Sequence, residues 1–174
     1  MLATARNQSS NIRTADHLGW TNSAAKVAAI CYRVDAGGEV EFLLIRTGSG
    51  RWTFPKGGVD GDATRAAAAA REAFEEAGVR GRIEPYSFTQ YLHVKSNGFL
   101  RHRARVVAVE AFLCQVKELV PPLEFHRDPT WFSPGKAKRK LREARPQRYA
   151  AELERVVDHA VQRIATRHSS KTGS

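Results

Sequence analysis

The chain has 174 residues, 42% hydrophobic and 26% charged, and this length and composition suit one globular domain with a full core. No apolar run approaches the roughly 20 residues of a membrane-spanning helix, and the N-terminal stretch lacks the apolar region of a secretory signal. The formal net charge of +10 suits a polyanionic partner, such as nucleic acid, an acidic membrane surface or a small polyphosphate, but equally a basic solvated surface.

Two strands and a hairpin are predicted near the start of the chain. Residues 1–24 are polar and weakly patterned, and we expect this segment to be partly disordered. The apolar runs 26–34 and 41–46 have strand length, and the turn residues between them predict a hairpin. A short strand is predicted over 51–54, where a proline follows it.

The middle of the chain alternates between helix and strand patterns. A helix is predicted over 64–77, with Gly78 in the position just past the last turn. Strand character returns over 86–94 and again over 105–116, where the run is long and apolar. A loop is predicted over 121–129.

The last helix has the clearest pattern, with apolar residues on one face of a 3.6-residue repeat and charges opposite. The apolar residues are Leu153, Val156, Val157, Ala160, Val161 and Ile164. The order of elements predicts one α/β domain over 25–168, with a mixed sheet and flanking helices, and a flexible tail over 169–174. Cys31 and Cys114 lie inside apolar runs, so we expect reduced core cysteines in a cytoplasmic protein.

Three carboxylates gather in the predicted helix over 64–77. Offsets of three and four residues return to one helix face, so Glu72, Glu75 and Glu76 repel one another there. Mg²⁺ or Mn²⁺ prefers oxygen ligands and would remove this conflict, while Arg71 can pair with Glu75 one turn on. Taken alone, such a cluster is more often a solvated acidic face. The preceding PKGGVDGD loop favours a metal site, because its glycines let the backbone approach a ligand closely.

This stretch resembles the signature of Nudix hydrolases, G-x5-E-x7-R-E-U-x-E-E-x-G-U, in which U is an aliphatic residue. The matching residues, in order, are Gly57, Arg71, Glu72, Ala73, Glu75, Glu76, Gly78 and Val79. One position departs from the pattern, because Ala63 stands where the signature has its first Glu. In the family that Glu usually supports the site rather than forming its core, and the adjacent Asp62 is a candidate to replace it in part.

The resemblance implies a Nudix-type α/β/α sandwich with a mixed β-sheet flanked by helices. It also implies an enzyme that hydrolyses phosphorus-containing acid anhydrides. The metal ligands would be Glu72, Glu75, Glu76 and the Gly57 carbonyl, and the catalytic residues would be the three glutamates with Arg71. The metal would be Mg²⁺, with Mn²⁺ possible. A diphosphate resists attack by an anion, and metal ions reduce both that repulsion and the pKa of the attacking water.

Within the family, the chain is most similar to diphosphoinositol polyphosphate phosphohydrolases, some of which also cleave diadenosine polyphosphates. The similar stretches include RWTFPKGG, HRARV, TWF and ARPQRY. The resemblance implies cationic residues around a highly phosphorylated substrate, for which the candidates are Arg13, Lys26, Arg46, Arg51, Lys56, His102 and Arg145. Arginine suits this role because it can grip phosphate through two hydrogen bonds. Each candidate is equally well explained as a solvated surface charge. For Lys138, Arg139 and Lys140, an exposed helix face is favoured.

For several other residues, the neighbouring sequence gives weaker evidence of a role in the site. Glu110, Glu118 and Glu124 are candidates for a further carboxylate from outside the signature, and the sequence does not rank them. His93 has no spaced partner and is interpreted as incidental. Trp20, in the polar N-terminal segment, is a candidate to cover the site.

Two alternatives compete with a hydrolase of polyphosphorylated small molecules. Smaller substrates, such as ADP-ribose, nucleoside triphosphates or nucleotide sugars, need the same chemistry. A Nudix-like binding module without turnover is the second alternative, suggested by Ala63. It is disfavoured because the three helix carboxylates and Arg71 are all present. No RNA-recognition motif with interleaved aromatic residues occurs, so nucleic acid is not the expected partner.

Overall fold

A computed structural model describes residues 26–61, 64–95 and 105–171 of the chain. Eight strands within these residues form one mixed sheet. They are β1 (Lys26–Val34), β2 (Val40–Arg46), β3 (Trp52–Thr53), β4 (Lys56–Gly58), β5 (Val79–Ile83), β6 (Thr89–Lys95), β7 (Arg105–Leu119) and β8 (Thr130–Phe132). The polar segment predicted over 1–24 lies outside the described residues.

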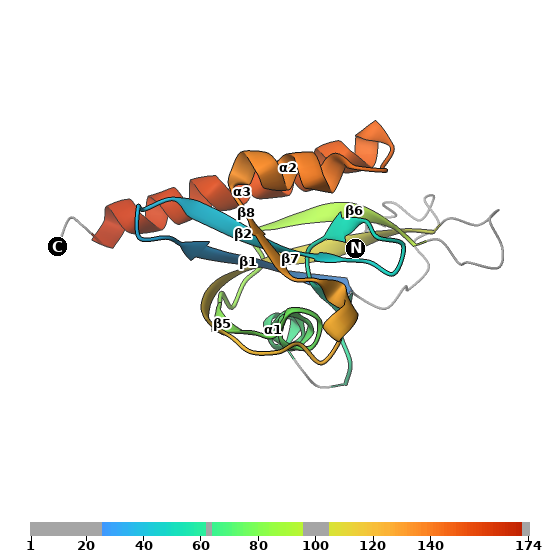
Figure 1. Cartoon of the computed structure of the whole chain (residues 1–174), viewed down its shortest axis with the longest axis horizontal. Coiled ribbons are helices and arrows are strands. Elements are labelled where there is room, and N and C mark those ends of the chain that lie inside the picture. The colour runs from blue at the N-terminus through green and yellow to red at the C-terminus, as the bar shows by residue number, and fades with distance from the viewer. Residues whose placement is uncertain (1–25, 62–63, 96–104, 172–174) are drawn as a thin grey trace, which may run out of the picture.

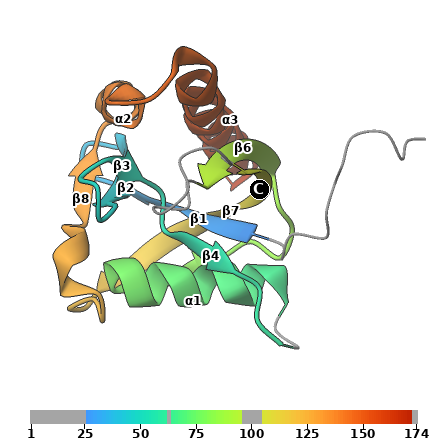
Figure 2. The ribbon, with the colours of Figure 1, turned by 90° about the vertical axis from the view of Figure 1, so that its right-hand side faces the viewer.

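Helices cover both faces of this sheet (Figures 1 and 2). The helix α1 (Arg65–Ala77) lies on one face, and α2 (Pro134–Arg142) and α3 (Gln147–Lys171) lie on the other. A single 3₁₀ turn, η1 (Phe125–Arg127), precedes β8. The three layers confirm the predicted α/β/α sandwich. In the part of the chain that the structure describes, none of the helices has both the length and the apolar character that crossing a bilayer requires.

The centre of the sheet is the parallel pair of β1 and β7, and the other described pairs are antiparallel. The main strand order is β3-β2-β1-β7-β5. Residues 32–34 of β1 pair with β2, whereas residues 26–28 pair with β4. The strands β2 and β4 therefore pair with different parts of β1, and the glycine-rich β4 lies beside the start of β1.

Alternation along β1 supplies two hydrophobic cores. Val27 and Ala29 pack in the core between the sheet and α1, while Ala28 and Ile30 pack in the core beneath α2 and α3. The α1 side of the first core is built largely from buried alanines, whose small side chains let the helix backbone lie close to the sheet. Because these side chains are short, the side of α1 that carries its polar residues lies close to β4.

Most of the predicted elements are present. The predicted hairpin corresponds to β1 and β2, and the helix predicted over 64–77 corresponds to α1. The strands β4, β5 and β8 are not among the predicted elements. β4 consists of one lysine and two glycines, which have little strand preference, and its pairing with β1 decides its conformation. The helix α3 continues to Lys171, into the segment predicted as a tail.

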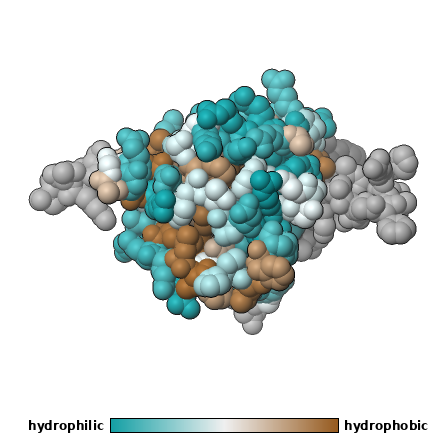
Figure 3. Space-filling model, in the orientation of Figure 1, coloured by the Kyte–Doolittle hydropathy of each residue, from teal (hydrophilic) through white to brown (hydrophobic). Residues whose placement is uncertain are grey.

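The surface over α2 is hydrophilic, as the top of Figure 3 shows. Lys138 pairs with Asp158 at 2.8 Å and Lys140 with Glu143 at 2.7 Å, while Arg139 is exposed. These lysines and the arginine form the solvated helix face that the sequence predicts for this basic run.

The two cysteines lie opposite each other at the centre of the sheet. Cys31 of β1 is paired in register with Cys114 of β7, and both are buried and free. The prediction that they are reduced core residues is confirmed.

Gly78 ends α1 in the left-handed conformation, with φ 66°, and its N–H donates to the Phe74 carbonyl at 2.9 Å. A β-carbon here would overlap the backbone carbonyl of Val120. We expect Gly78→Ala to lower the free energy of unfolding by about 2–4 kcal/mol, measured by urea denaturation, because left-handed strain and a backbone clash add together. Gly38→Ala is the control, since Gly38 has φ 85° with open space around it and should lose only about 1 kcal/mol. Equal losses of unfolding free energy in the two variants would mean that the overlap with Val120 does not affect stability.

Candidate active site

The helix α1 carries the three signature glutamates. Its first turn is capped by Thr64, whose Oγ1 accepts a hydrogen bond from the Ala67 N–H at 3.1 Å. Glu72 and Glu76 are four residues apart, so they lie along one side of the helix, next to its buried alanine face. This side faces β4, which lies alongside α1 (Figure 2).

Gly57 of β4 lies directly against the Glu72 carboxyl group, and a β-carbon at this position would overlap that group. The carboxyl group therefore occupies the space that any other residue would need for its side chain. Glu72 is only 15% exposed, and its burial raises the pKa of the carboxyl group, with a further rise from the charge of Glu76. The contact explains why this position of the signature requires glycine.

Glu76 is the most deeply buried of the three glutamates, at 5% exposed. One carboxylate oxygen accepts the Lys56 backbone N–H at 2.8 Å, and the other pairs with Arg127 Nη2 at 2.7 Å. Burial raises the pKa of Glu76, while the Lys56 N–H and the Arg127 charge act in the opposite direction. Glu76 thus joins α1 to β4 and to the segment that contains η1.

Arg71 holds the loop after β4 against α1. Its Nη2 lies 3.1 Å from the Gly58 carbonyl oxygen, 3.0 Å from Asp60 Oδ2 and 3.3 Å from Glu72 Oε1. The hydrogen bond with Asp60 raises the pKa of Arg71. The expected pairing with Glu75 is replaced by these contacts, because the loop brings a carboxylate and a carbonyl to the guanidinium group. Arg71 is therefore a positioning residue for Glu72 and the loop.

Glu110 is the extra carboxylate that lies on the same sheet face as Gly57. Both residues are opposite Val27 in register, on β7 and β4 respectively. Glu110 forms an ion pair with Arg65 of α1 and is 18% exposed. It is therefore a candidate to add an oxygen ligand near the helix.

The other two extra carboxylates differ in position. Glu124 pairs with Arg127 at 2.6 Å and so reaches Glu76 through that arginine, and its backbone N–H donates to the Glu75 carbonyl at 3.0 Å. Glu118 is exposed and pairs with Arg80 near the end of β7.

Two predicted cations lie on the opposite face of the sheet from the glutamates. Lys56 precedes Gly57 in β4, so strand alternation directs its side chain to that face, and Lys26 is opposite Gly58 in register and shares it. Burial lowers the pKa of the Lys56 ammonium to about 8, and the charge of Glu76 only partly opposes this. Lys56 is thus a half-buried cation whose charged form is disfavoured by desolvation.

A cavity of about 240 Å³ contains two more of the predicted cations. Its lining residues are Thr47, Arg51, Thr53, Tyr91, Leu92, His93, Val94, Arg145, Pro146, Tyr149 and Leu153. Arg145 donates to the carbonyl oxygens of Leu141, at 2.6 Å, and Trp52. Burial, together with the nearby charge of Arg51, lowers the pKa of Arg145 to about 10. The cavity therefore combines an apolar wall with positive charge.

His93 and Tyr91 extend this cavity on β6. Burial, together with the charges of nearby lysines and arginines, lowers the pKa of His93 to about 4, so the imidazole is neutral at pH 7. The Tyr91 hydroxyl is buried and has no hydrogen-bond partner among the described residues. His93, interpreted from the sequence as incidental, is therefore a lining residue of this candidate substrate cavity.

Several predicted residues lie away from these groups or outside the described residues. Arg46 stacks over Trp52 with 4.3 Å to the ring centroid and pairs with Asp128 at 3.2 Å, so it does not line the cavity. Arg13, His102, Asp62, Ala63 and Trp20 lie outside the described residues.

Arg127, Asp60 and Tyr91 are not among the site residues that the sequence predicts. Arg127 and Asp60 come from loops, where no periodicity marks a side chain as facing the site. Tyr91 and His93 did carry a signal, because residues two apart in a strand share a face.

The donor set of α1 suits a hard divalent cation. Glu72, Glu75, Glu76 and the Gly57 carbonyl offer only oxygen atoms, and burial disfavours the charged form of two of these carboxylates. No group of three His, Cys, Asp or Glu side chains converges as a ready metal site in the described ranges, and Glu76 is engaged by Arg127. A cation would therefore need to compete with that arginine.

The three-layer fold and the acidic helix against a glycine strand define a Nudix domain. A model of the NUDIX domain matches residues 24–153, and the chain belongs to this family. A similar curated protein is diphosphoinositol polyphosphate phosphohydrolase 2 of Rattus norvegicus, 37% identical over 71 residues. The match covers 41% of this chain and 38% of that protein, so it spans less than half of the relative's length.

Solved structures share the fold. An Ap4A hydrolase of C. elegans in a binary complex has a TM-score of 0.60 at 20% identity, covering 83% of this chain and 99% of that one. The NUDIX domain of Shewanella oneidensis NrtR, complexed with ADP ribose, has a TM-score of 0.60 at 14% identity, covering 87% and 94%. At these identities the likeness concerns the fold alone.

Proposed function

We propose that the protein is a metal-dependent pyrophosphohydrolase that cleaves a phosphoanhydride bond in a polyphosphorylated small molecule. The observation that carries the proposal is the double role of β4. Gly57 leaves room for the Glu72 carboxyl group on the sheet face that α1 covers. The side chain of the preceding residue, Lys56, lies on the opposite sheet face, together with Lys26. A phosphate chain that passes β4 would meet acidic groups on one side and basic groups on the other.

The metal would be held by Glu72, Glu75, Glu76 and the Gly57 carbonyl, with Glu110 as a further candidate. When bound, Mg²⁺ or Mn²⁺ would lower the pKa of the attacking water and offset the charge of the phosphates. Arg71 contacts the loop and Glu72, and these contacts would hold in place the oxygens proposed to bind the metal.

The cations would bind the phosphates that do not react. Lys26 and Lys56 lie beside β4, and Arg51 and Arg145 line the cavity. Burial lowers the pKa of both Lys56 and Arg145, so negative charge placed beside them would stabilise their charged forms. A bound phosphate chain would supply it. Arg46, Arg13 and His102 stay predictions.

The composition of the cavity favours a diadenosine polyphosphate over a diphosphoinositol polyphosphate. Tyr91, Tyr149, Pro146 and Leu153 provide apolar walls that suit a nucleobase. An inositol ring carries phosphates on every side, so its binding would put charged groups against these apolar side chains. The rat relative's name supports the diphosphoinositol substrate, and the name of the C. elegans structure supports the diadenosine one.

Two alternatives remain. A smaller nucleoside diphosphate derivative is supported by the Shewanella NUDIX domain, which was solved with ADP ribose. A binding module without turnover is supported by Ala63 and disfavoured by the intact contacts of Glu72, Glu76 and Arg71. The cytoplasmic location stays a prediction that rests on the two free cysteines.

The test is a panel of substrates assayed side by side with Mg²⁺ and, as a blank, with EDTA. The panel contains diadenosine hexaphosphate, a diphosphoinositol pentakisphosphate, ADP-ribose and ATP. We expect the fastest metal-dependent release of product from diadenosine hexaphosphate. Binding of every compound without product would support the module, and preference for the inositol compound would reject the nucleobase argument.

Arg145→Gln is expected to raise KM for the preferred substrate by about tenfold with little change in kcat, because Arg145 contacts a part of the substrate that does not react. Steady-state kinetics measures this. The KM of Arg145→Lys should lie between those of the wild type and Arg145→Gln, since lysine keeps the positive charge. Arg142→Gln is the control, because Arg142 is exposed, pairs with Glu154 and does not line the cavity. An unchanged KM for Arg145→Gln would remove the cavity from the substrate site.

A further inference from the structure

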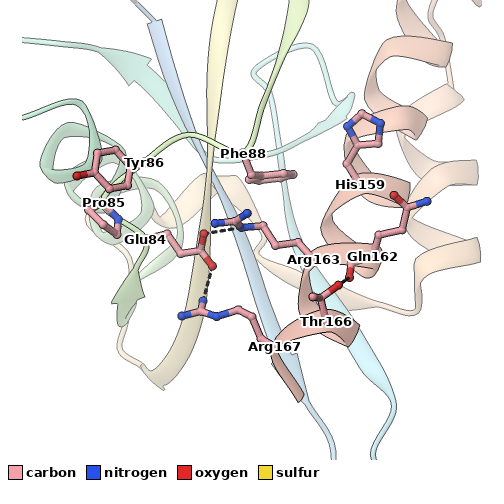
Figure 4. A pocket seen from close by; sticks show the side chains of 9 residues that line it. All are labelled: Glu84, Pro85, Tyr86, Phe88, His159, Gln162, Arg163, Thr166 and Arg167. Carbon is pink, nitrogen blue, oxygen red and sulfur yellow. Dashed lines mark hydrogen bonds and ion pairs between the residues drawn. The ribbon is translucent and has the colours of Figure 1, made fainter. Parts of the chain in front are cut away.

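A second cavity, of about 600 Å³, lies between the loop that joins β5 to β6 and the C-terminal half of α3 (Figure 4). It shares no lining residue with the 240 Å³ cavity. The helix α3 is on the sheet face opposite α1, so this cavity is also separate from the glutamates of the candidate active site. Its volume falls within the range of about 300–1,000 Å³ that is common for small-molecule sites.

A buried carboxylate fixes two arginines in this cavity. Glu84 is 6% exposed, and its two oxygens accept hydrogen bonds from Arg163 Nε, at 2.7 Å, and from Arg167 Nη1. Figure 4 shows the Glu84 carboxylate between the two guanidinium groups. The carboxylate is therefore fully engaged, and the two arginines are held in place before any ligand arrives.

The arginines keep hydrogen-bond donors for a ligand. Each guanidinium group has five N–H donors, and the bond to Glu84 uses one of them. The side chains of Arg163 and Arg167 are 47% and 48% exposed. Two arginines against one glutamate leave this cluster with a net positive charge. A buried carboxylate needs a positive partner, but a second arginine exceeds that need and favours an anionic ligand.

An aromatic surface lies beside the arginines. Tyr86 is 78% exposed although it lines the cavity, and Phe88, also a lining residue, packs partly against the core beneath α3. Both residues come from the loop side, and the arginines come from the helix side (Figure 4). A ligand between the two sides would contact a ring with one part and guanidinium groups with another.

We propose that this cavity is a second ligand site, which binds a nucleoside monophosphate. The phosphate accepts hydrogen bonds from the free N–H groups of Arg163 and Arg167, and the base lies against Tyr86 and Phe88. The phosphate supplies the negative charge that Glu84 does not, and the base covers the exposed Tyr86 ring. The proposal does not depend on hydrolysis at α1.

The experiment is an NMR titration of the ¹⁵N-labelled full chain with AMP. We expect the backbone amide signals of residues 84, 86, 88 and 159–167 to shift with AMP. Adenosine, which lacks the phosphate, and ribose 5-phosphate, which lacks the base, should each bind at least about tenfold more weakly. No shift of these amides at millimolar AMP would overturn the proposal. Binding of ribose 5-phosphate as tight as that of AMP would overturn the placement of the base on Tyr86.

Two variants test the two halves of the site separately. Arg167→Gln removes one phosphate contact, and Tyr86→Ala removes the exposed ring without touching the Glu84 cluster. Each should weaken AMP binding at these amides by at least about tenfold. The matched control is Arg139→Gln, an exposed arginine of α2, which should leave the affinity unchanged. Arg145→Gln should also leave these shifts intact, which separates this site from the proposed substrate cavity. Unchanged affinity in Tyr86→Ala would reject the site as drawn.

Discussion

Gly57→Ala is expected to lower kcat for phosphoanhydride hydrolysis by at least about 100-fold, while the protein stays folded. A β-carbon at this position would overlap the Glu72 carboxyl group, so the glutamate must turn away from β4. The turned carboxylate would no longer share a site with the Gly57 carbonyl. Metal-dependent assays and circular dichroism measure the two parts of this expectation.

Gly58→Ala is the matched control for this prediction. Its β-carbon would lie 3.7 Å from Asp60 Oδ1, which is ordinary contact distance, and both changes add the same methyl group to neighbouring residues of β4. Near wild-type activity in Gly58→Ala, with loss in Gly57→Ala, would tie the effect to Glu72. If Gly57→Ala keeps full activity, the contact with Glu72 has no role in the reaction.

Glu76→Gln is expected to reduce kcat by about 1,000-fold, a barrier increase of about 4 kcal/mol, because the variant loses a charged metal ligand. The fold should be retained. The amide oxygen of Gln can still accept the Lys56 N–H, and Arg127 keeps its pair with Glu124. The free energy of unfolding should therefore change by less than about 1 kcal/mol, since an amide replaces a carboxylate whose burial is costly. Activity assays and denaturation curves on the same preparation test both statements.

Glu118→Gln provides the control for charge removal, because Glu118 is exposed and pairs with Arg80 of β5. It should keep its activity. Full activity in Glu76→Gln would end the metal assignment. A collapse of the fold in that variant would instead make Glu76 a structural residue that joins α1 to β4.

The sequence predicted α1 and its acidic side because several local signals agree there. The spacing of the glutamates and the glycine after the last turn both specify the same helix, and these local signals do not depend on distant parts of the chain. The structure also places Gly57 against Glu72, two residues that the family resemblance groups as metal ligands. The hairpin of β1 and β2 was predictable for the same reason, since its turn residues lie between two apolar runs.

The rest of the site depends on contacts between distant segments. Arg127 is 51 residues beyond Glu76, and nothing in its own loop shows that it will pair with a buried carboxylate. Arg71 was expected to pair within its helix, but the loop after β4 supplies Asp60 and a carbonyl at the same place. His93 gains its role only when β6 and the start of α3 come together around one cavity. Such partners come from tertiary packing, which a local pattern does not encode.

The parallel pairing of β1 with β7 also affects how the protein reaches its native state. The core that supports α1 includes Val27 from β1 and Phe112 from β7, residues far apart in the chain. On the ribosome, α1 and its carboxylates are made before β7 emerges, and they have no complete sheet to rest on until it does. Long-range pairing of this kind slows folding, so assembly of the acidic helix against the sheet is expected to be a late step in biosynthesis.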